Sequence, residues 1–423
     1  MYRRHPTVCI VTSENMGEYA GIQRYVYDLT NFATAHGYKI SLVSSKDTGS
    51  LVVTRFFDSI GLNYDDLEKD RQGTKLLDNP FKSFFLFLST TFALIRTCKY
   101  RKVSIIHAQD VFFSGFSGVI ACKLLKIPLI VHVHGPSPYF FGLDSEASKI
   151  QKIAMRALAK VVLYGSDLVL PTDVHTKSLL FPFSSRSNYL CMPIPVQTKL
   201  FESACKKPIV SELKNQIVVG FVGRLCKQKN LQVLLNSFAS LPSSSRTKVS
   251  LVIVGDGPER DLLEREALRL GLKDKIFFAG RVSEEEKIKY LKSFDVFILP
   301  SIYEGCPISL LEAMASGKAV ITSDIPSIKQ VVNNNEAVLV DPYDSEKLRD
   351  AMLEVFDNPQ LISVLSKRAF EKAQFYDVET VFSQLMDLYD VCGKQHKCDC
   401  VGRFEEINNS FWPYNGSSAT TLK

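Results

Sequence analysis

The chain has 423 residues, of which 46% are apolar, 23% charged and 11% aromatic. These values are typical of a globular protein and exclude collagen, a coiled coil, a disulfide-rich miniprotein and a disordered chain. The net charge of +6 is uneven, because residues 1–200 hold 23 Lys and Arg against 15 Asp and Glu. The first half is therefore expected to face an acidic partner, unless this charge is only an ordinary solvated surface.

Short apolar runs rich in β-branched residues alternate with helical patterns along the chain. This alternation predicts parallel sheets covered by helices on both faces. Because it restarts near residue 216, we expect an α/β protein with two Rossmann-like, doubly wound domains. The predicted strands are Thr7–Thr12, Lys39–Val43, Val103–His107, Leu129–Val133, Leu168–Pro171, Gln216–Gly223, Lys248–Val254, Lys275–Ala279, Val296–Leu299, Ala319–Thr322 and Ala337–Val340.

The domain boundaries follow from the same pattern. We assign residues 1–200 to a first domain, 201–215 to a linker and 216–375 to a second domain. Residues 376–391 predict a helix that packs back on the first domain, and residues 392–423 lose periodicity and predict a disordered tail. Ligands of parallel sheets bind outside the carboxyl ends of the strands, so we expect the site in a cleft between the domains.

Targeting signals are not visible in the sequence. The apolar run near the N-terminus is too short for a signal peptide, and no stretch reaches the roughly 18 apolar residues of a transmembrane helix. Most of the ten cysteines are scattered singly, which is typical of reduced thiols in the cytoplasm. Cys392, His396, Cys398 and Cys400 form only half of a zinc-binding pattern, so we predict no metal site.

Two positions in the first half follow predicted strands. Gly21 is expected to begin a helix, where its N–H would face the cleft. His132 and His134 end the strand Leu129–Val133, and we expect them to point to opposite faces of the sheet. His134, at the very end, is either a buried polar group satisfied by the protein or a contact for the ligand.

Two basic segments of the first half also contain many apolar side chains. Residues 79–109 hold five basic residues, no acidic ones and several interleaved phenylalanines, and residues 148–162 place four basic residues near one helical face. Basic amphipathic helices favour an anionic membrane surface. The alternative is that both helices simply cover the first sheet. The basic residues are Lys82, Arg96, Lys99, Arg101, Lys102, Lys149, Lys152, Arg156 and Lys160.

Three loops of the second half follow strands. In GRLCKQKN, Gly223 ends a strand, and Arg224 and Lys229 could neutralise a diphosphate. VGDGPE (254–259) predicts a glycine turn with close backbone packing. In AGRVSEEE, backbone groups of Arg281 and Val282 could read a base edge, before a capping box that starts a helix. Each of these loops could instead be a plain strand-to-helix turn.

The segment 299–324, LPSIYEGCPISLLEAMASGKAVITSD, is the most informative. A strand ends before Glu304, and a helix is predicted from Ile308 to Ser316 with Pro307 at its first position. The free N–H groups at this helix start would bind an anion. Glu304 and Glu312, eight residues apart, could each hold neighbouring hydroxyl groups of a sugar diphosphate.

Together these motifs resemble the retaining GT-B glycosyltransferases of family GT4, whose signature is the E-x7-E element. The resemblance covers residues 7–390 and includes GRLCKQKN, VGDGPE, AGRV and the HG that ends a strand of the first domain. The chain departs from it at Ala20-Gly21, where the family often has Gly-Gly. The resemblance implies two Rossmann-like domains with an interdomain cleft.

The resemblance also implies roles for individual residues. Arg224 and Lys229 would bind the donor diphosphate, and Glu304 the transferring sugar. Glu312 would hold the ribose, and His134 would lie beside the reacting carbon or the 6-hydroxyl of the sugar. The remaining donor contacts would come from Gly21, Gly223, Arg281, Val282, Gly305, Cys306, Pro307 and Ile308.

We therefore predict a retaining transferase that moves a hexose or N-acetylhexosamine from a nucleotide sugar to a glycan or lipid-linked acceptor. The resemblance implies an enzyme of cell-surface polysaccharide or glycolipid synthesis that requires no metal or other cofactor, and we slightly prefer a UDP donor over GDP. The protein would be cytoplasmic and could bind a membrane peripherally. The alternatives are a nucleotide-sugar epimerase or a phosphorylase on the same fold, and a non-catalytic nucleotide-sugar-binding subunit. No nucleic-acid-binding motif is visible.

Overall fold

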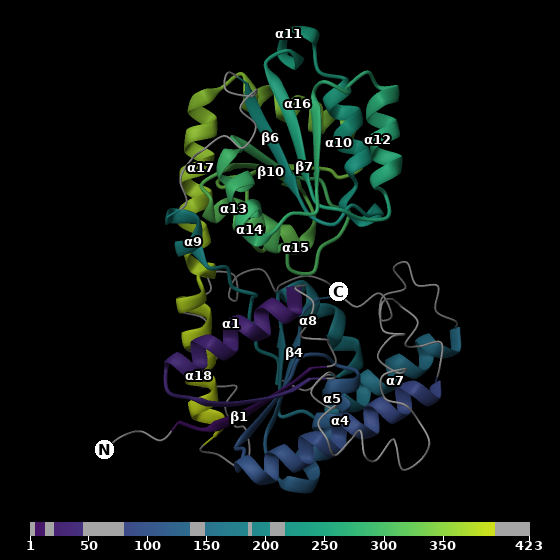
Figure 1. Cartoon of the computed structure of the whole chain (residues 1–423), viewed down its shortest axis with the longest axis vertical. Coiled ribbons are helices and arrows are strands. Elements are labelled where there is room, and N and C mark those ends of the chain that lie inside the picture. The colour runs from purple at the N-terminus through teal and green to yellow at the C-terminus, as the bar shows by residue number, and fades with distance from the viewer. Residues whose placement is uncertain are drawn as a thin grey trace. The chain divides into compact units, whose positions relative to one another are not determined.

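The computed structural model describes residues 5–12, 21–44, 80–135, 149–184, 188–203 and 216–393. The chain forms two compact units (Figure 1). Unit 1 comprises the described residues up to Pro193 and those from Phe382 onward, and unit 2 comprises Ile194–Val381. Most of the expected linker and the expected tail, except Cys392 and Gly393, lie outside the described residues.

Unit 1 contains a five-stranded parallel sheet in the order β2-β1-β3-β4-β5. The strands are short and apolar, and those in the middle of the sheet are buried along almost their whole length, as expected for a sheet with two covered faces. They are β1 (Thr7–Thr12), β2 (Lys39–Ser44), β3 (Ile105–Ala108), β4 (Leu129–Val133) and β5 (Leu168–Pro171).

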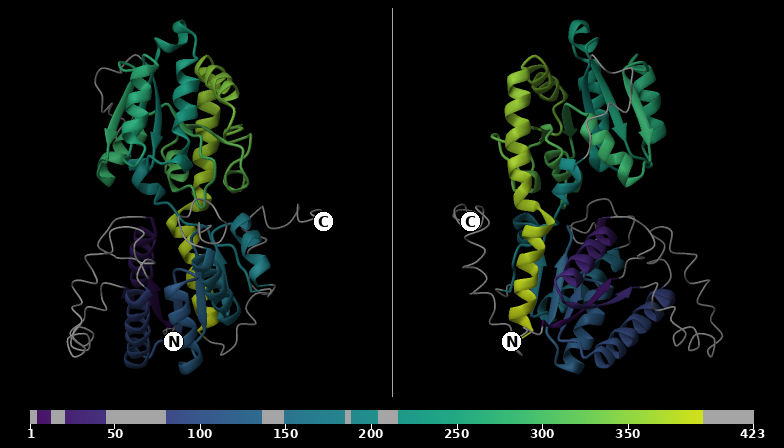
Figure 2. Two further views of the ribbon diagram at one scale, coloured as in Figure 1. Left: turned by 90° about the vertical axis from the view of Figure 1, so that its right-hand side faces the viewer. Right: turned by 60° about the vertical axis from the view of Figure 1, so that its left-hand side comes forward.

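Helices cover both faces of this sheet (Figure 2). One core is formed by alternate strand residues with α4, α5 and α7, and includes Val11, Val131 and Val162. On the opposite face, Tyr25 of α1 contacts His132 of β4, and Tyr389 of α18 contacts His107 of β3. The helices are α1 (Gly21–Ala35), α4 (Pro80–Arg101), α5 (Phe113–Leu125), α7 (Lys149–Gly165), α8 (Val174–Leu180), the 3-10 helix η3 (Phe181–Phe183) and α18 (Val378–Cys392), which belongs to this unit from Phe382 onward.

Unit 2 contains a six-stranded parallel sheet in the order β11-β10-β9-β6-β7-β8. Its central strands β6, β7 and β9 are almost fully buried. The strand order reverses between β6 and β9, which places the loops after these two strands at a topological switch point. The strands are β6 (Ile217–Val222), β7 (Val249–Val254), β8 (Ile276–Gly280), β9 (Val296–Leu299), β10 (Ala319–Ser323) and β11 (Val338–Val340).

The helices of unit 2 alternate with these strands, and side-chain caps mark the start of some of them. α13 begins with the predicted capping box, in which Ser283 and Glu286 bond to each other's backbone N–H. The helices are α9 (Thr198–Ser203), η5 (Lys227–Lys229), α10 (Leu231–Ala239), α11 (Ser243–Arg246), α12 (Arg260–Arg269), α13 (Glu284–Ser293), α14 (Ile308–Ala315), α15 (Pro326–Lys329), α16 (Ser345–Phe356), α17 (Pro359–Ala373) and η6 (Gln374–Tyr376).

The predicted fold class is confirmed. Every strand in the described residues coincides with a predicted run to within two residues at either end. The agreement has a physical reason, because strands buried on both faces must be apolar throughout and interrupt the helical pattern sharply.

Candidate functional site

In unit 2, the loops after β6, β7 and β8 are held together by backbone hydrogen bonds. The N–H of Leu225 donates to Asp256 at 2.9 Å, and that of Gly255 donates to Gly280 at 2.8 Å. A Cβ on Gly255 would lie 1.9 Å from the carbonyl oxygen of Gly223, and its φ is +134°. The glycine-rich turn therefore allows a close approach that a side chain would prevent.

Two of the predicted cations lie on the β6 loop. Arg224 is exposed to solvent directly after Gly223. Lys229 ends η5, and its Nζ lies 2.6 Å from Oε1 of Glu304. The side chains of Lys229 and Glu304 are only 14% and 4% exposed. Lys229 thus supplies the positive charge that compensates the buried carboxylate of Glu304, which is predicted to hold the sugar.

Hydrogen bonds also fix the β6 loop to the β9 loop. The backbone N–H of Ile302 donates to the carbonyl of Gln228 at 2.9 Å, and the Gln228 side chain donates to the carbonyl of Tyr303 at 2.8 Å. These bonds flank the ion pair between Lys229 and Glu304. The pair therefore lies at the switch point of the sheet, between two loops that these hydrogen bonds connect.

The second glutamate has its own lysine, which the sequence analysis did not identify. Nζ of Lys287 on α13 lies 2.7 Å from Oε1 of Glu312 on α14. The Glu312 side chain is 4% exposed and that of Lys287 15%. Nothing in the local sequence distinguishes Lys287 from the lysines that follow it, because only the packing of α13 near α14 creates the pair.

α14 differs from the prediction in three details. Pro307 is the N-cap and not the first helical residue. The N–H of Ile308 donates to the carbonyl of Cys306 at 2.9 Å, so it is already engaged, and Pro307 has no N–H. Ile308 and Pro307 therefore cannot supply two of the predicted backbone N–H contacts to phosphate. The helix also ends at Ala315, one residue earlier than expected.

The loop predicted to read the base lies directly before α13. Arg281 is exposed and Val282 is half-buried, between Gly280 and the N-cap Ser283. Lys287 follows one turn into the same helix. The loop is therefore joined to Glu312 through one helical turn and one ion pair.

His134 lies in unit 1 at the end of β4. Its Nε2 is 2.9 Å from Oε1 of Gln109, and its ring stacks on His132 with centroids 4.3 Å apart. The prediction that His132 and His134 point to opposite faces was wrong, because residues two apart in a strand share a face. His107 of β3 continues the stack, with 5.8 Å between its ring centroid and that of His132.

Burial keeps this histidine stack uncharged. It lowers the pKa of His132 to about 3, with a smaller opposing effect from the hydrogen bond to the carbonyl of Met192. Burial also lowers the pKa of His107 and His134, and neighbouring histidines lower both further. A neutral His134 can donate or accept a proton in hydrogen bonds but supplies no positive charge.

Gly21 begins α1, as predicted, and is exposed. One turn later, the Tyr25 ring meets the His134 ring edge-on, with 4.8 Å between their centroids. Unit 1 thus brings Gly21 and His134 to the same end of its sheet, the carboxyl ends of the strands. Ala20 and the loop 136–148 lie outside the described residues.

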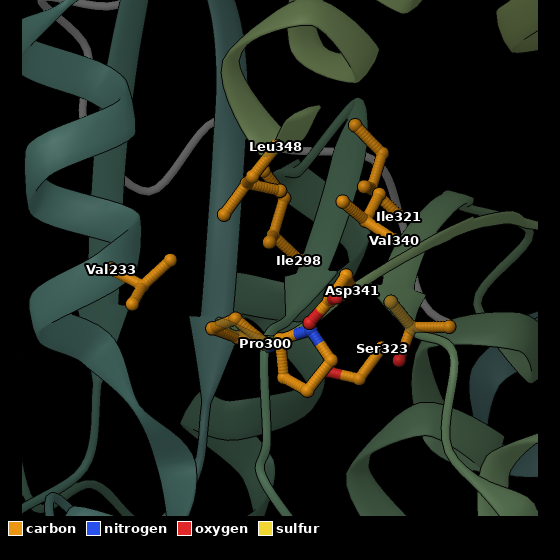
Figure 3. A pocket seen from close by; sticks show the side chains of 10 residues that line it. Val233, Ile298, Pro300, Ile321, Ser323, Val340, Asp341 and Leu348 are labelled. Atoms are coloured by element: carbon orange, nitrogen blue, oxygen red, sulfur yellow. The ribbon is translucent and has the colours of Figure 1, made fainter. Parts of the chain in front are cut away.

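A small cavity lies elsewhere in unit 2, at the carboxyl ends of β9, β10 and β11 (Figure 3). Its volume is about 10 Å³, and Ile298, Ile321 and Val340 contribute to its mainly apolar lining. The lining, as far as the structure describes it, includes none of the predicted site residues. A cavity of this volume holds at most about one water molecule, so it is not a sugar site.

The described ranges were compared with the requirements of a metal site and of a membrane-spanning helix. No group of three or more His, Cys, Asp or Glu side chains in these ranges is placed to hold a metal ion. Within the same ranges, none of the helices has the length and apolar content that crossing a bilayer requires.

Comparison with protein families gives two matches along the chain. A model described as Glycosyltransferase Family 4 matches residues 19–180, and one described as Glycosyl transferases group 1 matches residues 206–372. The second range contains Arg224, Glu304 and Glu312, and the first contains Gly21 and His134.

Among curated proteins, the chain is 26% identical over 269 residues to the alpha-monoglucosyldiacylglycerol synthase of Streptococcus pneumoniae. That alignment covers 60% of this chain and 61% of the synthase, so the chain spans about three fifths of that relative's length. The chain is 25% identical over 339 residues to the UDP-Gal:alpha-D-GlcNAc-diphosphoundecaprenol alpha-1,3-galactosyltransferase of Escherichia coli. This alignment covers 75% of this chain and 85% of that protein.

Among solved structures, Anabaena HepE in complex with UDP superposes with a TM-score of 0.67 at 16% identity, over 90% of this chain and 99% of that one. Sucrose-phosphate synthase from Thermosynechococcus elongatus gives 0.71 at 20% identity, over 90% and 98%. At this level of identity the likeness establishes the fold.

Proposed function

Because the chain belongs to the GT4-like glycosyltransferases of the GT-B fold, which act on nucleotide sugars, we propose that it transfers a hexose or N-acetylhexosamine with retention of the anomeric configuration. The acceptor is a glycan or a lipid-linked sugar. The observation that carries this proposal is the pair of buried glutamates, Glu304 and Glu312, each bonded to a lysine of its own.

In the proposed donor complex, Glu304 bonds to hydroxyl groups of the transferring sugar and Glu312 to those of the ribose. A carboxylate accepts up to about four hydrogen bonds, so a glutamate that is paired with a lysine can also accept hydrogen bonds from hydroxyl groups. Arg224, Lys229 and the start of α14 lie on the diphosphate side. Developing negative charge on the leaving diphosphate would be stabilised there, which is where most of the rate acceleration would arise.

We assign no protein nucleophile. In the proposed same-face reaction, the acceptor oxygen attacks the anomeric carbon while the bond to the diphosphate breaks, and the acceptor proton moves to the leaving phosphate oxygen. Neutral His134 would contact the sugar and would carry no charge during this step.

Donor binding without a divalent metal is part of the proposal. Arg224 is exposed, and Lys229, which is paired with Glu304, lies on the same loop, so we propose that both cations act on the diphosphate. The E. coli relative is named for UDP-Gal, which supports UDP over GDP as the nucleotide. Thermal stabilisation by a panel of nucleoside diphosphates, measured with magnesium and with a chelator, tests this directly. A shift that requires magnesium would contradict metal-independent binding.

The activity test is the conversion of a UDP-sugar in the presence of lipid-linked and soluble glycan acceptors. A product with the donor's anomeric configuration supports the proposal, and an inverted product contradicts it. Epimerised donor formed without acceptor would instead identify an epimerase. Donor binding with no turnover in any acceptor mixture would identify a non-catalytic nucleotide-sugar-binding subunit.

We also propose that unit 1 binds the surface of an anionic membrane. Three neighbouring helices, α4, α5 and α7, together contain nine Lys or Arg and no Asp or Glu. α5 contacts both α4 and α7, so the helices form one layer (Figure 1). Exposed apolar side chains lie among these charges, and Phe92, Tyr100 and Ile153 are 57%, 80% and 67% exposed.

On α4 the basic and apolar residues share one face. Phe92, Ile95, Arg96, Lys99 and Tyr100 line a shallow groove. They occupy positions i, i+3, i+4, i+7 and i+8, which lie on one side of a helix. Lipid headgroup phosphates match the basic side chains, and the apolar side chains can enter the headgroup region. A lipid-linked acceptor would be reached from such a surface. The side chains of Phe81, Phe84 and Phe85 lie outside the description.

Vesicle sedimentation tests this contact. Binding is expected to vesicles of phosphatidylglycerol mixed with phosphatidylcholine and not to phosphatidylcholine alone. Reversing two charges, in Arg96→Glu with Lys99→Glu, should weaken binding by at least about tenfold, since each basic residue contributes about 1 kcal/mol. The exposed Lys367 of α17 in unit 2 gives the matched control, Lys367→Glu. Equal binding to both vesicle types would contradict the proposal.

A further inference from the structure

Lys287 forms an ion pair with the buried Glu312, and its own side chain is only 15% exposed. Its Nζ donates to Glu312 Oε1 at 2.7 Å and also lies 2.9 Å from Oε2 of Glu284. Glu284 is half exposed, whereas Glu312 is 4% exposed. The lysine thus joins a surface carboxylate to an interior one.

The cost of burying Glu312 explains why a cation is needed there. An ionised carboxylate removed from water is destabilised by several kcal/mol unless a charge and hydrogen bonds compensate it. A nucleoside diphosphate brought to the same region adds further negative charge. Lys287 offsets both effects, and it holds one oxygen of Glu312 in a defined position.

Lys287 also lies near the other predicted nucleotide contacts. It is the fourth residue of α13, whose preceding loop carries Arg281 and Val282. Glu312 is the fifth residue of α14, and the loop before this helix contains Gly305 and Cys306. The ion pair therefore connects the loop proposed for the base to the helix proposed for the ribose and the diphosphate.

Lys289, on the same helix, forms an ion pair at the protein surface. It lies two residues later, is 52% exposed and pairs with Glu285, which is 80% exposed. A surface pair of this kind contributes about 0–1 kcal/mol and is screened by salt. The contrast between Lys287 and Lys289 makes the second lysine a matched control.

We propose that Lys287 is a positioning residue that orients Glu312 and thereby makes the ribose 2′,3′-diol the feature by which this site selects its nucleotide. The inference rests on the proposed function, because it takes Glu312 as the ribose contact. Lys287 would act through Glu312, and its loss would weaken only those ligands that carry the diol.

The experiment measures the affinity of the full chain for UDP and GDP and for their 2′,3′-dideoxy analogues by calorimetry. For wild type we expect the natural nucleotide to bind about 10–100-fold more tightly than its dideoxy analogue, as for hydrogen bonds to a charged acceptor. Lys287→Met should weaken the natural nucleotide about tenfold and leave the dideoxy analogue unchanged. Lys287→Arg should restore most of the preference, and Lys289→Met should have no effect.

A double-mutant comparison separates positioning from a general loss of structure. If Lys287 acts through Glu312, then Lys287→Met should have little further effect on affinity in the Glu312→Gln background. Thermal melts of each variant show whether unit 2 remains folded, and the arginine variant provides a charged, folded comparison. Equal weakening of natural and dideoxy ligands by Lys287→Met, or no weakening of either, would overturn the proposal.

The failure of the proposed function gives a different result. If wild type binds none of the nucleoside diphosphates, the donor site itself is wrong, and the role of Lys287 falls with it. If wild type binds UDP or GDP but does not discriminate against the dideoxy form, nucleotide binding stands and the positioning role of Lys287 is refuted.

Discussion

The ammonium nitrogen of Lys229 lies 2.6 Å from a carboxylate oxygen of Glu304, although 75 residues separate the two in the sequence. β6 and β9 are neighbours in the sheet of unit 2, so the loops that follow them meet at its carboxyl edge. The pair is therefore set by the strand order and does not need a ligand to form. It places a positive charge against a buried carboxyl group where the donor sugar is proposed to bind.

The first prediction concerns the Glu304 carboxylate. Glu304→Gln keeps the shape of the side chain but removes its charge and its ion pair with Lys229. We expect kcat/KM for sugar transfer to fall about 100-fold, because hydrogen bonds to a charged group are worth about 1.5–3 kcal/mol. Steady-state transfer assays check this value. Glu285→Gln, at an exposed position of α13, is the control, and unchanged transfer by the Glu304 variant would refute its role.

The second prediction concerns Arg224. Its side chain is exposed, so Arg224→Ala should leave the melting temperature of the free protein unchanged. Loss of a forked contact to phosphate should weaken nucleoside diphosphate binding about 10–100-fold. Calorimetry with UDP and GDP measures the effect, and Arg224→Lys should recover only part of it. Arg265→Ala on the exposed side of α12 is the control; a comparable loss of affinity there would indicate a nonspecific charge effect.

The third prediction tests the close backbone contact between the β6 and β7 loops. In Gly255→Ala, the new Cβ would overlap the Gly223 carbonyl at a φ of +134°. The free energy of unfolding should fall by about 3 kcal/mol or more, and nucleotide binding should weaken because the Arg224 loop is displaced. At Gly271, where φ is +69°, a Cβ would meet no atom of the described residues within 4 Å, so Gly271→Ala should cost only about 1 kcal/mol.

Urea unfolding of both glycine variants makes the comparison. Both substitutions add a methyl group at positive φ, but only Gly271 has a φ that L residues can adopt. The difference between them therefore reports the steric overlap at Gly255 together with its greater backbone strain. Equal destabilisation would mean that the loops of unit 2 adjust freely, and that their contact does not fix the site.

The fourth prediction concerns pH and the histidine stack of unit 1. Burial lowers the pKa of His132 to about 3, whereas an unfolded histidine titrates near about 6.5. Between these values the unfolded state binds a proton that the folded state does not. The free energy of unfolding should therefore fall as pH drops below about 6.5, by about 1 kcal/mol from His132 between about pH 7 and 5.5.

Urea titrations of wild type and His132→Phe over this interval measure that contribution. The variant has no imidazole at position 132 that could bind a proton in the unfolded state. Its free energy of unfolding relative to wild type should therefore rise by about 1 kcal/mol as the pH falls from about 7 to 5.5. Above about pH 7.5 the difference should be constant, which provides the internal control. A difference independent of pH throughout would show that His132 is not held neutral by burial.

The sequence by itself determined the strands and the fold class, and it also selected the segments of the candidate site in unit 2. Strands such as β6 and β9 are apolar along their whole length because both faces are covered, and this requirement is visible locally. The E-x7-E spacing and the residues GRLCKQKN are also local, so Glu304, Glu312, Arg224 and Lys229 could be selected. The sequence also contained the information that His132 and His134 share a face, because side chains two residues apart in a strand point to the same side. The prediction of opposite faces was therefore avoidable.

Only the tertiary structure decided which charges meet. Lys229 pairs with Glu304 because β6 and β9 are adjacent, and Lys287 pairs with Glu312 because α13 and α14 bring these side chains together. The N–H of Ile308 is occupied by Cys306 because the chain turns tightly before α14. These contacts depend on strand order and helix packing, which a local pattern does not encode, so the residue that neutralises each glutamate was decided by the fold.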